Sequence, residues 1–172
     1  MLFRSAHHDA GWLKKLKREY GFESVQIKDI TSDYAIFGIW GPKAREILQS
    51  LTNSDLSPTA FPFMHSKEIE INRTIVRATR ITYVGELGWE LLIPVKDALP
   101  IWQKLVDAGA KPCGYRAIES LRLEKGYLAW AGEINTEYNP YEAGLGFAIS
   151  KSKSNFFGAK ALTKLKIGRA HV

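Results

Sequence analysis

The stretch that decides the fold is Lys67-Glu-Ile-Glu-Ile-Asn-Arg-Thr-Ile-Val-Arg-Ala-Thr-Arg-Ile-Thr82. Its composition predicts two strands, over Lys67–Ile71 and Thr74–Thr82. Asn72-Arg73 between them predicts a tight hairpin turn, because Asn tolerates a positive φ. A hairpin makes its two strands antiparallel neighbours, so this stretch argues against a purely parallel, doubly wound sheet.

Three other segments have the character of strands. Val25–Ile30 alternates only weakly between apolar and polar side chains. Tyr34–Trp40 is apolar on both faces, which is typical of a central strand. Trp89–Val95 is the third, and it contains a single charged residue, Glu90, near its beginning.

Helices are predicted where apolar residues recur at helical spacing. The expected helices cover residues 11–20, 44–51, 98–105 and 115–125, with Gly109 as a suitable stop for the third. Strands and helices intermixed around a hairpin favour an α+β fold of split βαβ (ferredoxin-like) type. After Tyr127 the chain is rich in Gly, Asn and Tyr, which indicates loops with short strands.

The net charge is less informative than it first looks. The 172 residues include 24 Lys and Arg against 18 Asp and Glu, a formal charge of +6 that suggests a nucleic-acid or membrane partner. Residues 149–172, however, hold six basic side chains and no acid, so residues 1–148 are charge-balanced. A basic nucleic-acid-binding module is therefore the least favoured of three hypotheses, and we expect neither nucleic acid nor a membrane as partner.

Other protein classes are excluded by single observations. The only cysteine, Cys113, allows no intrachain disulfide framework and no cysteine-based zinc site. No apolar run approaches the roughly 20 residues that a spanning helix needs. The His7-His8-Asp9 sequence near the terminus is more typical of solvated side chains than of a metal site, and we expect no metal. These features indicate a soluble, intracellular globular domain.

Two segments carry unusual charges. The first, Arg80–Glu90, places Tyr83, Glu86 and Glu90 around two glycines between two strands. A carboxylate at Glu90 must find a partner or face a cavity, because burying an unpaired charge is costly. The second, Gly114–Gly126, places three charged residues close to one helical stripe; these are Arg116, Glu119 and Arg122.

Two interpretations of these charges remain open at this point. In the first, Arg116 and Arg122 each pair with Glu119 in a lattice of ion pairs, which Glu90 could join. In the second, a carboxylate and a guanidinium face a planar polar ligand. A carboxylate can accept two parallel hydrogen bonds from an amidine-like N–C–N edge, each contributing roughly 1.5–3 kcal/mol.

The motifs Tyr83-Val-Gly-Glu-Leu-Gly-Trp-Glu90 and Arg116-Ala-Ile-Glu-Ser-Leu-Arg-Leu-Glu-Lys-Gly126 resemble those of the folate-binding aminomethyltransferase family. That family includes the glycine-cleavage T-protein and the C-terminal halves of dimethylglycine and sarcosine dehydrogenases. The resemblance runs from about Trp12 to Leu162. The first motif is more similar to that of the dehydrogenase branch, because the T-protein usually has Thr where Val84 stands.

The resemblance implies a folate pocket. Glu90 matches the family carboxylate that binds the amino-pyrimidine edge of the pterin, and Arg116 matches an arginine beside it. Tyr83 matches a pocket tyrosine, and Phe147 stands where the T-protein has a tryptophan near the folate. Glu86 is also expected at the cofactor, and Glu86 and Arg122 are expected to support the first pair.

The resemblance also implies the chemistry of an intact protein. Tetrahydrofolate captures a one-carbon unit from a methylated glycine or an aminomethyl carrier and becomes 5,10-methylenetetrahydrofolate. The aspartate that assists in the family lies upstream of the matched positions, so no catalytic residue is assigned. FAD is expected only in a missing upstream domain. The chain is thus expected to be a fragment that is inactive alone, from a mitochondrial or bacterial cytoplasmic enzyme; the alternative is a non-catalytic folate-binding regulator.

Four segments are expected along the chain. Residues 1–24 end a truncated N-terminal segment, and residues 25–130 form the second half of the folate-binding domain. Residues 131–165 are expected to connect to and begin a C-terminal β domain. Residues 166–172 follow no earlier pattern and are expected to be a non-native tail.

Overall fold

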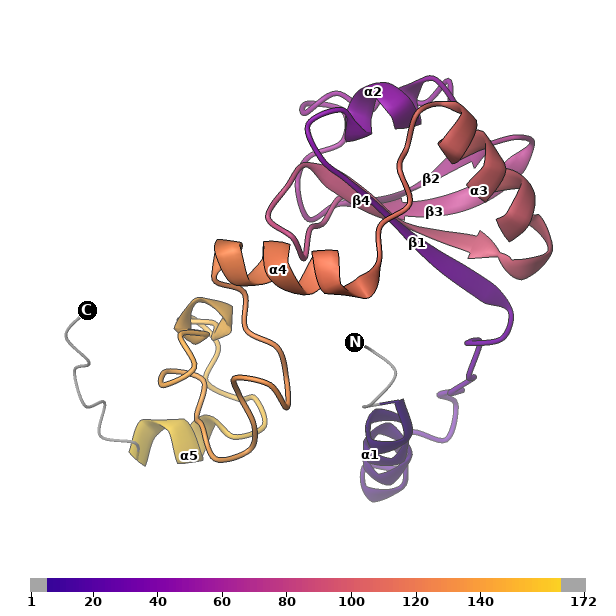
Figure 1. Cartoon of the computed structure of the whole chain (residues 1–172). Helices are drawn as coiled ribbons and strands as arrows, with labels where there is room; N and C mark the ends of the chain where they lie inside the picture. Colours follow the sequence, from indigo (N-terminus) through magenta and orange to yellow (C-terminus); the bar gives the residue numbers. More distant parts are fainter. Residues whose placement is uncertain (1–5, 165–172) are drawn as a thin grey trace. The chain divides into compact units, whose positions relative to one another are not determined.

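A computed structural model of the chain describes residues 6–164, so the predicted tail at 166–172 lies outside the described residues. The chain divides into two compact units, residues 1–113 and residues 114–172. Each unit is described separately below, with the elements labelled as in Figure 1. None of the helices within residues 6–164 is long and apolar enough to span a bilayer.

The first unit is built on a four-stranded antiparallel sheet. Its strands are β1 (Tyr34–Trp40), β2 (Ser66–Ile71), β3 (Thr74–Thr79) and β4 (Gly88–Pro94), and their order in the sheet is β1-β4-β3-β2. This arrangement confirms the α+β class. It does not confirm the split βαβ detail, because two strands, β4 and β3, separate β1 from β2, whereas a split βαβ unit has one strand between the two that its helix connects.

The predicted hairpin is confirmed. Strands β2 and β3 pair in register from Ser66↔Thr79 to Ile71↔Thr74, so only two residues form the turn. Asn72 and Arg73 both have positive φ, 53° and 63°, as a type I′ turn requires. Strand β3 ends at Thr79, three residues earlier than expected.

Two strand predictions were wrong. Val25–Ile30 forms no strand, and at its end the Asp29 carboxylate accepts hydrogen bonds from the amide and the hydroxyl of Thr31. Such local bonding competes with strand pairing. Strand β1 was expected to be central, but it lies at an edge of the sheet, and Ile36 is 52% exposed. Its apolar outer face therefore does not reflect burial.

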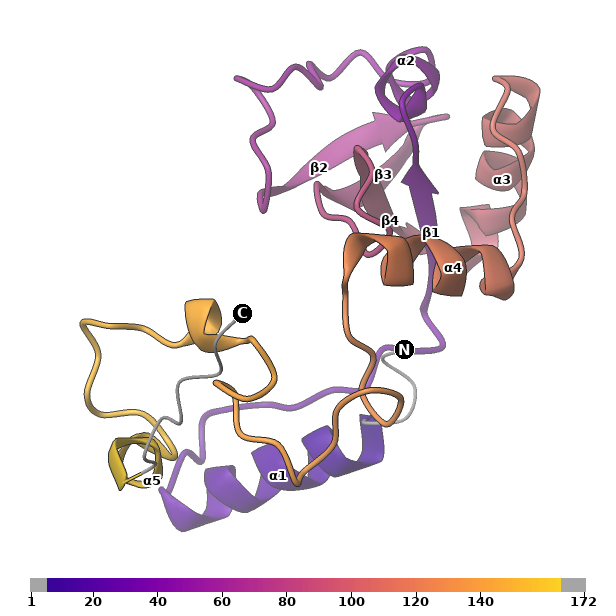
Figure 2. The same cartoon turned by 60° about the vertical axis from the view of Figure 1, so that its left-hand side comes forward.

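The core of this unit lies between one face of the sheet and two helices. Helix α2 (Ala44–Gln49) contributes Leu48, and helix α3 (Ala98–Asp107) contributes Ile101 and Leu105. Alternate residues of β4 meet them; these are Trp89, Leu91 and Ile93, all fully buried. Figures 1 and 2 show α2 and α3 beside the strands. The two predicted helices are confirmed, and their apolar spacing explains which side faces the sheet.

Strand geometry fixes what the opposite face carries. Side chains alternate along a strand, so Glu90 and Leu92 of β4 point away from the core that Trp89 and Leu91 enter. The two exposed isoleucines of this face, Ile36 and Ile75, lie on β1 and β3. We call this surface the outer face of the sheet.

The remaining helix of the first unit is α1 (Ala6–Glu19), which begins five residues before the expected start and has no buried residue. A short 3-10 helix, η2 (Val95–Asp97), precedes α3. Gly109, with φ of 102°, follows α3 as expected of a helix stop.

The second unit contains α4 (Tyr115–Lys125), the 3-10 helix η3 (Gly146–Ala148) and α5 (Ala159–Lys164). Helix α4 matches its prediction and ends at Gly126, whose φ of 78° makes it a left-handed cap. The short strands expected after Tyr127 were wrong for the described residues, where a single bridge joins Trp130 and Ile134. The other described residues of the second unit form loops and turns.

Candidate functional site: the outer face around Glu90

Glu90 is the third residue of β4, an inner strand of the sheet. It faces Gly38 of β1 on one side and Thr79 of β3 on the other. The side chain is half-buried on the outer face, because its strand neighbours Trp89 and Leu91 turn into the core. Within residues 6–164, its carboxylate has no hydrogen-bond or ion-pair partner.

Two glycines leave space beside this carboxylate. Gly38 is the cross-strand partner of Glu90, and Gly88 is its same-face neighbour along β4. A Cβ on either glycine would overlap atoms of Trp40, so the indole uses the room that they leave. Glycine inside a strand often marks a close approach of another group to the backbone. Here that group is the indole ring.

Tyr83 and Glu86 lie in the loop that leads from β3 into β4. Tyr83 is half-buried and takes part in an interaction, whereas Glu86 is exposed. Buried Val84 and Gly85, which has a φ of 81°, shape the loop between them. The loop continues directly into Gly88 at the start of β4, two residues before Glu90.

Arg116 and Phe147 belong to the second unit. Arg116 is exposed in the first turn of α4, and within residues 6–164 no carboxylate lies within ion-pair distance of it. Phe147 lies on η3 and is 86% exposed. The predicted site residues are thus divided, with Tyr83, Glu86 and Glu90 in the first unit and these two in the second.

Arg122, rather than Arg116, is the centre of an ion-pair cluster. Its side chain is 3% exposed and its guanidinium donates to Glu119 Oε2 at 2.7 Å. Two further hydrogen bonds, at 2.9 and 3.1 Å, go to the carboxylate oxygens of Glu133. The expected Arg122–Glu119 pair is confirmed, but the expected Arg116–Glu119 pair is not found in the described structure. We call Arg122, Glu119 and Glu133 the Arg122 cluster.

Hydrogen bonding sets the protonation of the Arg122 cluster. The guanidinium of Arg122 and the hydroxyl of Tyr115 hold the pKa of Glu119 below its usual value. Arg122 and the backbone amide of Ala129 do the same for the pKa of Glu133. Both carboxylates in turn raise the pKa of Arg122. The cluster is therefore fully charged at neutral pH, and sequence periodicity gave no signal for Glu133, which lies in a loop.

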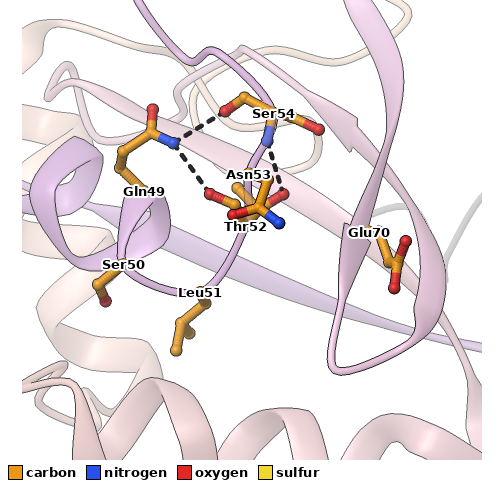
Figure 3. A pocket seen from close by; sticks show the side chains of 7 residues that line it. All are labelled: Gln49, Ser50, Leu51, Thr52, Asn53, Ser54 and Glu70. Atoms are coloured by element: carbon orange, nitrogen blue, oxygen red, sulfur yellow. Dashed lines mark hydrogen bonds between the residues drawn. The ribbon is translucent and has the colours of Figure 1, made fainter.

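A polar pocket lies in the first unit. It has a volume of about 440 Å³ and is lined by residues 49–54 and Glu70 (Figure 3). The carboxamide of Gln49 donates to the carbonyls of Thr52 and Ser54 and accepts from the amide of Leu56, so its polar groups serve the loop itself. None of the predicted folate-binding residues lines this pocket.

Among the described residues, no group of three or more His, Cys, Asp and Glu side chains is arranged to hold a metal. Glu90 offers a half-buried carboxylate with free acceptor capacity beside an aromatic ring, which matches a flat ligand with an N–C–N donor edge.

Curated relatives cover most of this chain. It is 38% identical over 164 residues to mitochondrial dimethylglycine dehydrogenase of Mus musculus, spanning 92% of this chain and 19% of the relative. It is 43% identical over 142 residues to mitochondrial sarcosine dehydrogenase of Homo sapiens, spanning 80% and 16%. The aminomethyltransferase of Thermoanaerobacter sp. (strain X514) is 38% identical over 162 residues, spanning 92% and 43%.

The chain thus spans about a fifth of the length of the two dehydrogenases. Among solved structures, the heterotetrameric sarcosine oxidase from Corynebacterium sp. U-96 in complex with pyrrole 2-carboxylate is 23% identical, with a TM-score of 0.49, over 59% of this chain and 53% of that chain. The family described as the GCVT N-terminal domain matches residues 3–153. This match covers most of the chain and confirms the resemblance found in its motifs, so the chain belongs to the GCVT N-terminal domain family.

Proposed function

We propose that this chain is the tetrahydrofolate-binding part of a one-carbon-transfer enzyme of the dimethylglycine or sarcosine dehydrogenase or aminomethyltransferase type. The observation that carries the proposal is Glu90, a half-buried carboxylate on the outer face that has no partner among the described residues. Burying a charge without a partner is unfavourable, so a sequence that keeps one there has a use for it. A bound donor edge supplies that use.

Glu90 would recognise the pterin ring by charge-assisted hydrogen bonds. Its two oxygens can accept the ring N–H and the exocyclic amino group in parallel, each bond contributing roughly 1.5–3 kcal/mol. Gly38 and Gly88 carry no side chain of their own beside Glu90, and the Trp40 indole occupies the space that they leave, so the ligand would lie against that ring.

The other family residues take supporting roles in this proposal. Tyr83 and Glu86 precede β4 and would border the ligand from the loop. Arg116 on α4 and Phe147 on η3 are proposed as folate-binding residues from the family resemblance alone. Arg122 would not contact the ligand but would stabilise the second unit, because the Arg122 cluster joins α4 to the loop that follows it.

Bound tetrahydrofolate supplies the nucleophilic nitrogen that accepts a one-carbon unit from a methylated glycine or an aminomethyl carrier. The residues of this chain bind and orient the folate, and 5,10-methylenetetrahydrofolate is the proposed product of the intact protein. FAD is proposed only for a domain outside this chain. The proposed compartments are the mitochondrion, which the names of the dehydrogenase relatives state, or the bacterial cytoplasm.

Because the chain spans about a fifth of the dehydrogenases and none of its residues is assigned the family's catalytic aspartate, we expect binding without turnover. The decisive experiment is calorimetric titration of 5-formyltetrahydrofolate, a stable reduced folate, into the wild-type chain and Glu90→Gln. We expect saturable binding that weakens at least about tenfold in the variant.

A matched control is available on the same face of the sheet. Glu68 is an exposed carboxylate of β2 that already pairs with Arg77 at 3.3 Å. Glu68→Gln should therefore bind folate as the wild type does. Equal binding by Glu90→Gln and the wild type would rule out the proposed role of Glu90.

A further inference from the structure

Trp40, the last residue of β1, lies on the outer face next to Glu90. A Cβ built on Gly38 would overlap Cη2, Cζ3 and Cζ2 of the Trp40 ring, so the indole folds back along β1 over that glycine. Gly38 is also the cross-strand partner of Glu90. Paired residues on one face of an antiparallel sheet lie about 4.5–5.5 Å apart, so the ring over Gly38 lies next to the position of Glu90.

The indole is held from several sides. Its Nε1 donates to the carbonyl of Ile81 at 3.0 Å. Its Cδ1 lies against the backbone of Gly88, where a Cβ would leave no room. A ring held by a hydrogen bond and two glycines loses little further freedom when a ligand packs on it, which favours recognition.

The surroundings of this ring are suited to a flat ligand. Leu92, the neighbour of Glu90 along β4, is half-buried on the same face and pairs with exposed Ile36. A planar heteroaromatic molecule could place its N–C–N edge at Glu90 and its ring system against Trp40 and this apolar strip. A monocyclic ligand would reach the carboxylate but have less ring to place against the indole.

From this geometry we infer that Trp40 is a specificity-determining residue, an aromatic wall that makes the Glu90 site prefer a bicyclic pterin over a single pyrimidine ring. The inference rests on the proposed function, because it assigns Trp40 to the same ligand site. It adds a residue that none of the sequence motifs had assigned to binding.

The test compares two ligands that share one donor edge. The first is 5-formyltetrahydrofolate and the second is 2-amino-4-hydroxypyrimidine, which has the N–C–N edge but no second ring. We expect Trp40→Leu to weaken binding of the folate about three- to tenfold and binding of the pyrimidine less than about twofold. Trp102→Leu is the matched control, because Trp102 packs on Phe37 from α3 and not on the outer face.

A second measurement follows ligand binding in the wild-type chain and uses a variant only to identify one signal. In an amide correlation spectrum of the wild-type chain, the Trp40 Nε1–H signal, identified by its loss in Trp40→Phe, should shift as folate is added. The Nε1–H signal of Trp12, on α1, should not shift.

The outcomes separate this inference from the proposed function. The role of Trp40 is overturned if its signal does not move, or if Trp40→Leu loses the same affinity for both ligands. If Glu90→Gln has lost folate binding in that case, the proposed folate site still stands. No saturable folate binding by the wild-type chain overturns both.

Discussion

Arg122 and Glu133 are joined by two hydrogen bonds, Nη1 to Oε2 at 2.9 Å and Nη2 to Oε1 at 3.1 Å. The same guanidinium donates to the carbonyl of Tyr127 at 2.9 Å, and Glu133 accepts from the amide of Ala129 at 2.7 Å. One buried arginine therefore restrains residues 127–133, the first part of the loop after α4. The described part of this unit has no sheet that could order the loop, so these hydrogen bonds are a main source of its stability.

Removing the arginine should destabilise the chain strongly. Arg122→Leu leaves two carboxylates and a carbonyl without their common donor, which is the costly way to break an ion pair. We expect the melting temperature to fall by more than about 5 °C, followed by circular dichroism. Arg116→Leu, in the exposed first turn of the same helix, should change it by about 1 °C or less. Equal shifts in the two variants would contradict a stabilising role for the Arg122 cluster.

The Arg122 cluster should also make stability depend on acid. Hydrogen bonds hold the pKa values of Glu119 and Glu133 below their unfolded values in the folded chain. Protons therefore bind more tightly to the unfolded state, so this stabilisation is present above the unfolded pKa of about 4.5 and is lost as the pH falls through the lower folded values.

The measurement is the melting temperature of the wild type and Arg122→Leu from pH 7 to pH 3. The wild type should lose stability more steeply below about pH 5 than the variant does. Asp29 and Asp55 also have lowered pKa values, through Thr31 and Ser57, but they contribute equally to both proteins. Parallel pH profiles would show that the Arg122 cluster does not contribute to acid sensitivity.

The sequence predicted the elements that local rules determine. The hairpin followed from alternation and from Asn72, and α2, α3 and α4 followed from apolar spacing. The edge position of β1 could not be predicted, because an apolar strand does not say how many strands will pair with it. Glu133 was missed for a similar reason, since its partner lies in another element.

In the candidate site, too, local sequence predicted one residue, and a residue that depends on the pairing of two strands was missed. Glu90 was identified because one charge interrupts an apolar strand, and in the structure its alternation with Trp89 places it away from the core. Trp40 was missed, although a signal was present: Gly38 stands two residues before it on the same face, and a glycine at that spacing lets a large ring fold back along the strand. Only the register of β1 with β4 shows that this ring borders Glu90.

The hairpin turn offers a stabilising substitution. Arg73 has a φ of 63°, a conformation that glycine adopts without the strain of a Cβ, and a type I′ turn favours glycine there. Arg73→Gly should raise the free energy of unfolding by about 0.5 kcal/mol in urea denaturation. Arg77→Gly, within β3, is the contrasting variant and should be destabilising. A loss of stability in Arg73→Gly would contradict the turn type.

Glu90 should show opposite effects on stability and on binding. Its side chain is half-buried and has no partner among the described residues, so Glu90→Gln breaks no described hydrogen bond or ion pair, and a neutral amide costs less to bury than a carboxylate. We expect urea denaturation to show unchanged stability or a gain of about 0.5 kcal/mol, while folate binding weakens. A structural carboxylate would behave differently, because its loss would lower stability, as we expect for Glu133→Gln in the Arg122 cluster. Reduced stability in Glu90→Gln would therefore show that Glu90 supports the fold, and the folate site would have to be sought elsewhere.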